Sequence, residues 1–180
     1  MGSINPSPHK YPHLSPDQVS SFMNHGFLRL ESCFTPAQAH DWTSTVWQRL
    51  NMSPTDKSTW TVERTNMASH RKKHVSVFAP KAWAAICDLL GGEERISVES
   101  ATWGDGLIVN LGSPEWEGKT CDPKQLTGWH SDGDFFMHFL DSREQALLVI
   151  PLFTDIVDNA GGTMVCSDAI GKIAKWLVRF

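Results

Sequence analysis

The sequence ALLVIPLF, residues 146–153, is a strongly apolar run on which the fold prediction rests. Its apolar residues do not alternate with polar ones, a pattern typical of a strand that is covered on both faces. We therefore predict a central strand whose even-numbered and odd-numbered side chains face opposite, largely covered sides. Replacing Ile150 by alanine in such a strand should cost about 2–5 kcal/mol.

Shorter strand patterns lie before and after this run, and helical patterns dominate the first half of the chain. Strands are predicted at 27–30, 96–99, 107–111, around His130 and at 163–166. Ser15-Pro16 and Thr35-Pro36 are typical helix starts, with a capping hydroxyl followed by proline in the first turn. They predict helices over 16–25 and 36–50, and further helices are predicted over 80–90 and 170–180.

The order of helices first and strands later favours an α+β fold, with the strands in a sandwich or jelly roll and the helices supporting it. Residues 1–13 are rich in Pro, Ser, Asn and His and are expected to form a flexible arm. Residues 14–180 then form a single domain. Residues 51–79 are polar and predicted to be irregular, and 113–127 are predicted to form a long loop.

Composition narrows the function classes. Hydrophobic residues make up 41% of the chain and charged residues 20%, which is typical of a globular protein. The net charge of −4 argues against a nucleic-acid partner, and no apolar run reaches the length of a membrane span. The four cysteines form no C-x-x-C pair, so we expect reduced thiols in a cytoplasmic protein. The oligomeric state is left open.

The segment GWHSDGD, residues 128–134, carries the chemistry. On a strand, His130 and Asp132 are two residues apart and point to the same face, so an imidazole and a carboxylate lie side by side. These are two of the three donors in the two-histidine, one-carboxylate site that holds non-haem Fe(II). Asp134 lies further along and is expected to have an outer role, and His138 is too distant on an unbroken strand.

A resemblance supports the iron interpretation. The segment WHSDGDFFMHFLDSREQALLVIPLFTDIVDNAGGTMV, residues 129–165, resembles the phytanoyl-CoA dioxygenase family of Fe(II)/2-oxoglutarate oxygenases, and in particular a fungal branch with a similar WH-x-DGDFF segment. The similarity extends to APKAWAAICDLLGG, WGDGLIVNLG and SPDQVSSFMNHGFLRLESCFTPAQ, so that it covers residues 14–178.

The resemblance implies a double-stranded β-helix (jelly roll) with N-terminal supporting helices, and a small organic substrate. It makes His130 and Asp132 the first two ligands of Fe(II), with 2-oxoglutarate as co-substrate. The family's distal histidine and its 2-oxoglutarate-binding arginine lie well beyond a glycine turn that corresponds here to 159–162, and neither is found in the sequence. The expectation is a partial jelly roll whose C-terminal part is missing, and a chain that does not turn over 2-oxoglutarate.

Two further residues are candidates for the co-substrate site, each with a structural alternative. Asn110 ends an apolar strand, where its amide either meets 2-oxoglutarate or only satisfies the strand edge. Thr163 follows the glycine turn, where it either binds a carboxylate or serves as a β-branched strand residue. Two other interpretations of the whole chain stay open: a non-catalytic relative that acts as an interaction domain, and a β-rich binding module in which the H-x-D pair is coincidental.

Overall fold

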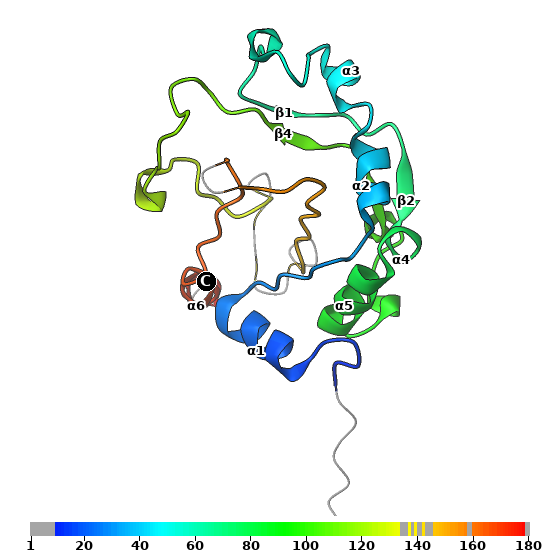
Figure 1. Cartoon of the computed structure of the whole chain (residues 1–180). Coiled ribbons are helices and arrows are strands. Elements are labelled where there is room, and N and C mark those ends of the chain that lie inside the picture. Colours follow the sequence, from blue (N-terminus) through cyan, green and yellow to red (C-terminus); the bar gives the residue numbers. More distant parts are fainter. Residues whose placement is uncertain are drawn as a thin grey trace, which may run out of the picture.

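The computed structural model describes residues 10–133, 137, 139, 142, 146–157 and 160–178. Its helices are α1 (Pro16–His25), α2 (Pro36–Thr43), α3 (Val46–Leu50), α4 (Val75–Phe78), α5 (Pro80–Leu90) and α6 (Ile170–Leu177). Its strands are β1 (Arg64–Asn66), β2 (Lys72–His74), β3 (Thr102–Gly104) and β4 (Ile108–Asn110) (Figure 1). The predicted α+β class is confirmed.

Helices α1, α2, α5 and α6 begin where the sequence predicts, whereas α4 comes from the segment 51–79 that was predicted to be irregular. The Ser15 and Thr35 hydroxyls each accept a hydrogen bond from the backbone N–H three residues later. The side-chain oxygens of Gln18 and Gln38 accept one in turn from the backbone N–H of the cap residue, which completes two capping boxes. At its C-terminus α1 is closed by Gly26, whose φ of +73° belongs to the left-handed region that glycine enters without strain. The predicted helix over 36–50 is divided, because the helical backbone is interrupted at 44–45 between α2 and α3.

Two small antiparallel sheets follow, β1 with β4 and β2 with β3. Strand β4 confirms the prediction for 107–111, whereas β1 and β2 come from the segment that was predicted to be irregular. Thr65 pairs with Val109, and Lys73 pairs with Trp103. The sheets therefore tie residues 64–74 to residues 102–110.

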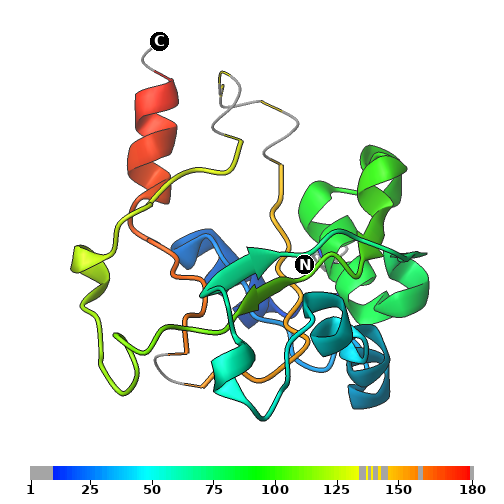
Figure 2. The same ribbon diagram turned by 90° about the horizontal axis from the view of Figure 1, so that it is seen from above.

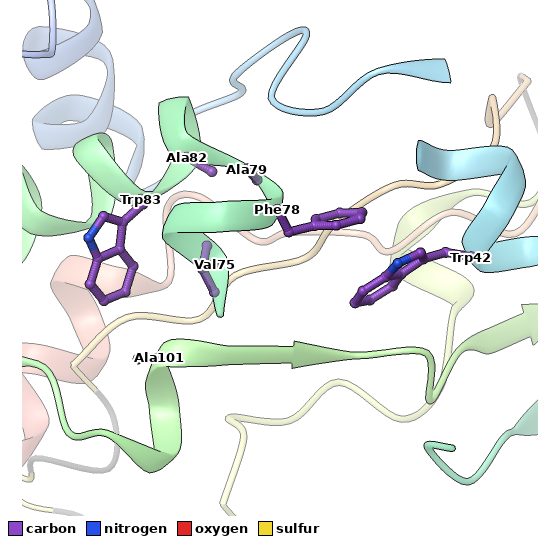
Figure 3. Close-up of a cluster of buried hydrophobic side chains, with 7 residues drawn as sticks. All are labelled: Trp42, Val75, Phe78, Ala79, Ala82, Trp83 and Ala101. Atoms are coloured by element: carbon purple, nitrogen blue, oxygen red, sulfur yellow. The ribbon is translucent and has the colours of Figure 1, made fainter. Parts of the chain in front are cut away.

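The buried core lies around α4 and α5, as Figure 3 shows, and consists of Trp42, Val75, Phe78, Ala79, Ala82, Trp83 and Ala101. Phe78 is 1% exposed, and its ring lies 4.2 Å from that of Trp42 and 5.5 Å from that of Phe34, centroid to centroid. Phe153 stacks on Phe34 at 5.0 Å and on Trp42 at 5.6 Å. The C-terminal apolar run thus reaches the core through its last residue.

The other strand predictions are wrong for the described residues. No strand is formed at 27–30, at 96–99, around His130, over 146–153 or at 163–166. Leu148 and Ile150 are 65% and 47% exposed, so the run over 146–153 is not covered on both faces. The physical reason is that a strand requires a neighbour to satisfy its backbone N–H and C=O groups, and within the described residues only the four strands above are paired.

Helix α6 confirms the predicted C-terminal helix, while residues 179–180 lie outside the described part. Figures 1 and 2 place α6 on the opposite side of the molecule from α4 and α5, with the chain of residues 146–157 between them. Ile170 at the start of α6 packs against Gly26, where an added Cβ would lie 1.7 Å from Ile170 Cδ1. None of the described helices is long and apolar enough to cross a membrane.

The N-terminal segment is anchored to α5. Asp88 is 7% exposed and accepts hydrogen bonds from the backbone N–H groups of His13 and Leu14, at 2.7 and 3.0 Å. It also lies 2.9 Å from His13 Nδ1. Residues 1–9 of the predicted arm lie outside the described residues, and its last residue, His13, is held by this carboxylate.

Candidate metal site

His130 and Asp132 converge even though no strand is formed there. The distance from His130 Nε2 to Asp132 Oδ1 is 3.3 Å, and the two side chains are 64% and 50% exposed. The pair therefore lies at the surface, where a small ion or molecule reaches it from solvent.

The other ring nitrogen of His130 is held by the backbone. Nδ1 lies 2.7 Å from the carbonyl oxygen of Gly128. Because a carbonyl oxygen only accepts, Nδ1 must carry the proton of this hydrogen bond. Gly128 has a φ of +81°, a conformation that other residues rarely adopt. Gly128 thus positions the carbonyl that orients the imidazole.

With Nδ1 protonated, Nε2 faces the carboxylate in one of two states. If Nε2 is also protonated, the imidazolium and Asp132 form an ion pair. If Nε2 is not protonated, its lone pair and the carboxylate both present negative density, and a shared cation makes the arrangement favourable. A ligating histidine commonly donates its second ring N–H to a backbone carbonyl, as His130 does to Gly128.

The spacing of the pair fits two adjacent positions on one metal ion. Protein nitrogen and oxygen donors bind such ions at about 2.0–2.2 Å, so two donors whose bonds meet at about a right angle lie roughly 3 Å apart. The observed separation of 3.3 Å agrees with this value. Within the described part of the chain, no group of three or more His, Cys, Asp or Glu residues is arranged to hold a metal. Asp134 and His138 lie outside the described residues.

The two candidates for the co-substrate site are close to the same turn. Asn110, at the end of β4, donates from Nδ2 to the carbonyl oxygen of Gly161 at 3.2 Å. Gly161 has a φ of +75° and belongs to the predicted glycine turn, of which residues 158 and 159 lie outside the description. Thr163 is exposed and follows two residues later. The structure therefore gives the Asn110 amide a backbone partner and links β4 to the segment that carries Thr163.

Sequence reasoning missed the most highly connected carboxylate. Asp105 is 3% exposed and accepts from the backbone N–H groups of His70 and Arg71, at 2.7 and 2.9 Å. Arg49 Nη1 lies 3.3 Å from its Oδ2 and donates to its backbone oxygen at 3.1 Å. A clue was available in the sequence, where Asp105 lies between Gly104 and Gly106 directly before a predicted strand.

The Asp105 cluster has a structural role. Burial raises the pKa of Asp105, but the N–H groups of Arg71 and His70, together with the Arg49 guanidinium, outweigh it and hold the pKa below the ordinary value of an aspartate. The carboxylate thus stays charged and joins the turn before β2, the turn after β3 and helix α3.

Comparison with known proteins adds no relative, because no family model, no curated protein and no solved structure matches the chain.

Proposed function

We propose that this chain is a relative of the phytanoyl-CoA dioxygenase family and that His130 and Asp132 bind a divalent metal ion, with Fe(II) as the physiological metal. The observation that carries the proposal is the 3.3 Å approach of His130 Nε2 to the Asp132 carboxylate, with Nδ1 directed to the Gly128 carbonyl. The motif resemblance of residues 129–165 adds support. The proposal includes a partial jelly roll supported by the N-terminal helices.

Each residue has a defined part in this function. His130 and Asp132 donate to the metal, and Gly128 fixes the tautomer and direction of the imidazole. Asn110 and Thr163 are proposed to meet the co-substrate 2-oxoglutarate. When bound, iron supplies the oxidative chemistry on a small organic substrate, while the protein binds and orients. The four free cysteines, Cys33, Cys87, Cys121 and Cys166, agree with a reducing compartment such as the cytoplasm.

Two protein donors leave more of the coordination positions of the ion to water than three do. We therefore propose that residues 1–180 bind metal weakly and do not turn over 2-oxoglutarate. Purified chain incubated with Fe(II), ascorbate and 2-oxoglutarate should release no succinate above the control without protein. Succinate release that disappears in His130→Ala would show a completed iron site and would contradict this part of the proposal.

Metal binding itself is tested with Mn(II), whose free-ion signal in electron paramagnetic resonance disappears on binding. We expect His130→Ala and Asp132→Ala each to weaken Mn(II) binding at least tenfold. The matched control is His25→Ala, which removes an exposed imidazole at the end of α1 and should leave binding unchanged. Equal affinity in wild type and His130→Ala would refute the assignment of the pair.

A second candidate function is that of an interaction domain without catalysis. Leu148, Leu152, Val165 and Trp176 are each more than half exposed. This candidate predicts a partner or a second copy on this surface, and light scattering over a concentration series tests the second copy. A mass that stays monomeric would exclude self-association.

A further inference from the structure

A hollow lies beside α5, at one end of the buried core. Its walls come from α5, from the chain between η2 (Glu93–Arg95) and β3, from β3 itself, and from the apolar run near residue 148. Its volume is about 220 Å³. Figure 3 shows Trp83 at one end of the core cluster, with Phe78 and Trp42 at the other. The lining residues are Trp83, Ile86, Leu90, Ile96, Ser100, Trp103, Leu147 and Val149.

The side chains that line it carry no charge, and their polar groups are the Ser100 hydroxyl and the indole N–H groups of Trp83 and Trp103. Ser100 Oγ accepts from Ser97 Oγ at 2.9 Å, so that the O–H of Ser100 can itself donate to a ligand. A charged ligand would lose its hydration without gaining a counter-ion. The hollow therefore favours an uncharged organic molecule.

One wall of the hollow is fixed before any ligand binds. Trp83 is 9% exposed, and the His74 ring meets it edge-on with centroids 5.0 Å apart. The volume of the hollow is about one and a half times that of an apolar cavity of about 150 Å³ that takes benzene. Two fused aromatic rings match this size, and the indole rings of Trp83 and Trp103 in the lining offer them aromatic contacts.

We propose that this hollow binds a flat, uncharged molecule of two fused rings with one polar group for Ser100. This site is separate in its residues from the proposed metal pair, and it makes no use of His130 or Asp132. The probe is 2-naphthol, titrated into the full chain and followed by calorimetry. We expect a Kd on the order of 10–100 μM, in line with the affinity that ligands of about ten heavy atoms reach.

The chemistry of the site is tested with a charged analogue of the probe and with a variant whose larger side chain occupies the hollow. Naphthalene-2-sulfonate should bind at least tenfold more weakly than 2-naphthol. Ile86→Trp places a large ring in the α5 wall and should weaken 2-naphthol binding at least tenfold. Val98→Trp adds the same ring at a position that is 80% exposed and does not line the hollow, and it should change nothing. Circular dichroism checks that both variants fold.

Val149→Arg gives an independent test at the rim, where the native side chain is 37% exposed and its replacement does not disturb the core. The new guanidinium should weaken 2-naphthol binding and strengthen binding of the sulfonate. The preference of the site for 2-naphthol over naphthalene-2-sulfonate should therefore become smaller or reverse. If Ile86→Trp does not fold, the result for Val149→Arg alone tests the site. Three results would overturn the proposal: no binding of 2-naphthol, equal binding of both probes to wild type, or an unchanged 2-naphthol affinity in folded Ile86→Trp or in Val149→Arg.

Discussion

Replacement of Phe78 by alanine tests whether the core lies where the structure places it. Phe78 is 1% exposed, and its ring meets those of Phe34, Trp42, Trp103 and Phe153. Removing the ring loses its transfer free energy and leaves a cavity of roughly 100 Å³, which at about 24 cal/mol per Å³ contributes about 2.4 kcal/mol. With the transfer term added, Phe78→Ala should lower the free energy of unfolding by about 3–5 kcal/mol.

The matched control is Ile150→Ala, in the run that the sequence predicted to be central. Ile150 is 47% exposed, so the expected loss is below about 1 kcal/mol, and the larger loss expected from sequence no longer applies. Urea unfolding followed by circular dichroism measures both variants, and for a chain of this length about 1 kcal/mol corresponds to about 2–4 °C in Tm. Equal losses, or a larger loss for Ile150→Ala, would refute this placement of the core.

Three further predictions concern the anchors of the fold. Asp105→Asn should cost about 1–3 kcal/mol at neutral pH. The folded-state pKa of Asp105 is lowered, so the stabilisation by its carboxylate is complete above about pH 4, near the unfolded-state pKa of an aspartate, and is lost as the pH falls through the folded-state pKa. The difference in unfolding free energy between wild type and Asp105→Asn should therefore become smaller at acidic pH. A difference that stays constant with pH would contradict this. Gly26→Ala should lower the stability by about 1–2 kcal/mol because of the positive φ, and by a further amount because the new methyl group clashes with Ile170. Adding Ile170→Ala should recover the stability lost to the clash. A double variant no more stable than Gly26→Ala would show that the contact is absent. Asp88→Ala should cost about 1–3 kcal/mol and speed amide exchange at His13, and unchanged exchange there would refute the anchoring.

Helix positions were predictable because their signals are local. The hydroxyl of Ser15 and the side chain of Gln18 are three residues apart and satisfy each other's backbone within one turn. Gly26 closes the same helix for an equally local reason, its positive φ. Such contacts need no knowledge of the rest of the chain.

Strand positions were less predictable because a strand depends on its neighbour. Residues 146–153 are apolar enough for a strand, but no backbone partner is present for them among the described residues. Conversely, β2 has the polar sequence Lys72–His74 and is a strand because β3 pairs with it. Val75 and Phe78, directly after β2, enter the core from a segment whose composition predicted a loop.

The candidate site could be predicted in part from the sequence. The two-residue spacing of His130 and Asp132 indicated that their side chains meet, and they do so without the strand from which that expectation was derived. The glycines beside Asp105 marked a turn, but its partner Arg49 could not be predicted, because it lies 56 residues away along the chain. The metal role of the pair stays a prediction.

That role is tested most directly by identifying the nitrogen bound to the metal. Pulsed electron paramagnetic resonance on the chain with one equivalent of Mn(II) detects modulation from a coordinated imidazole nitrogen. We predict modulation from one imidazole in wild type, its loss in His130→Ala and its retention in the control His25→Ala. Modulation that survives in His130→Ala, or that is absent from wild type with Mn(II) bound, would contradict the account.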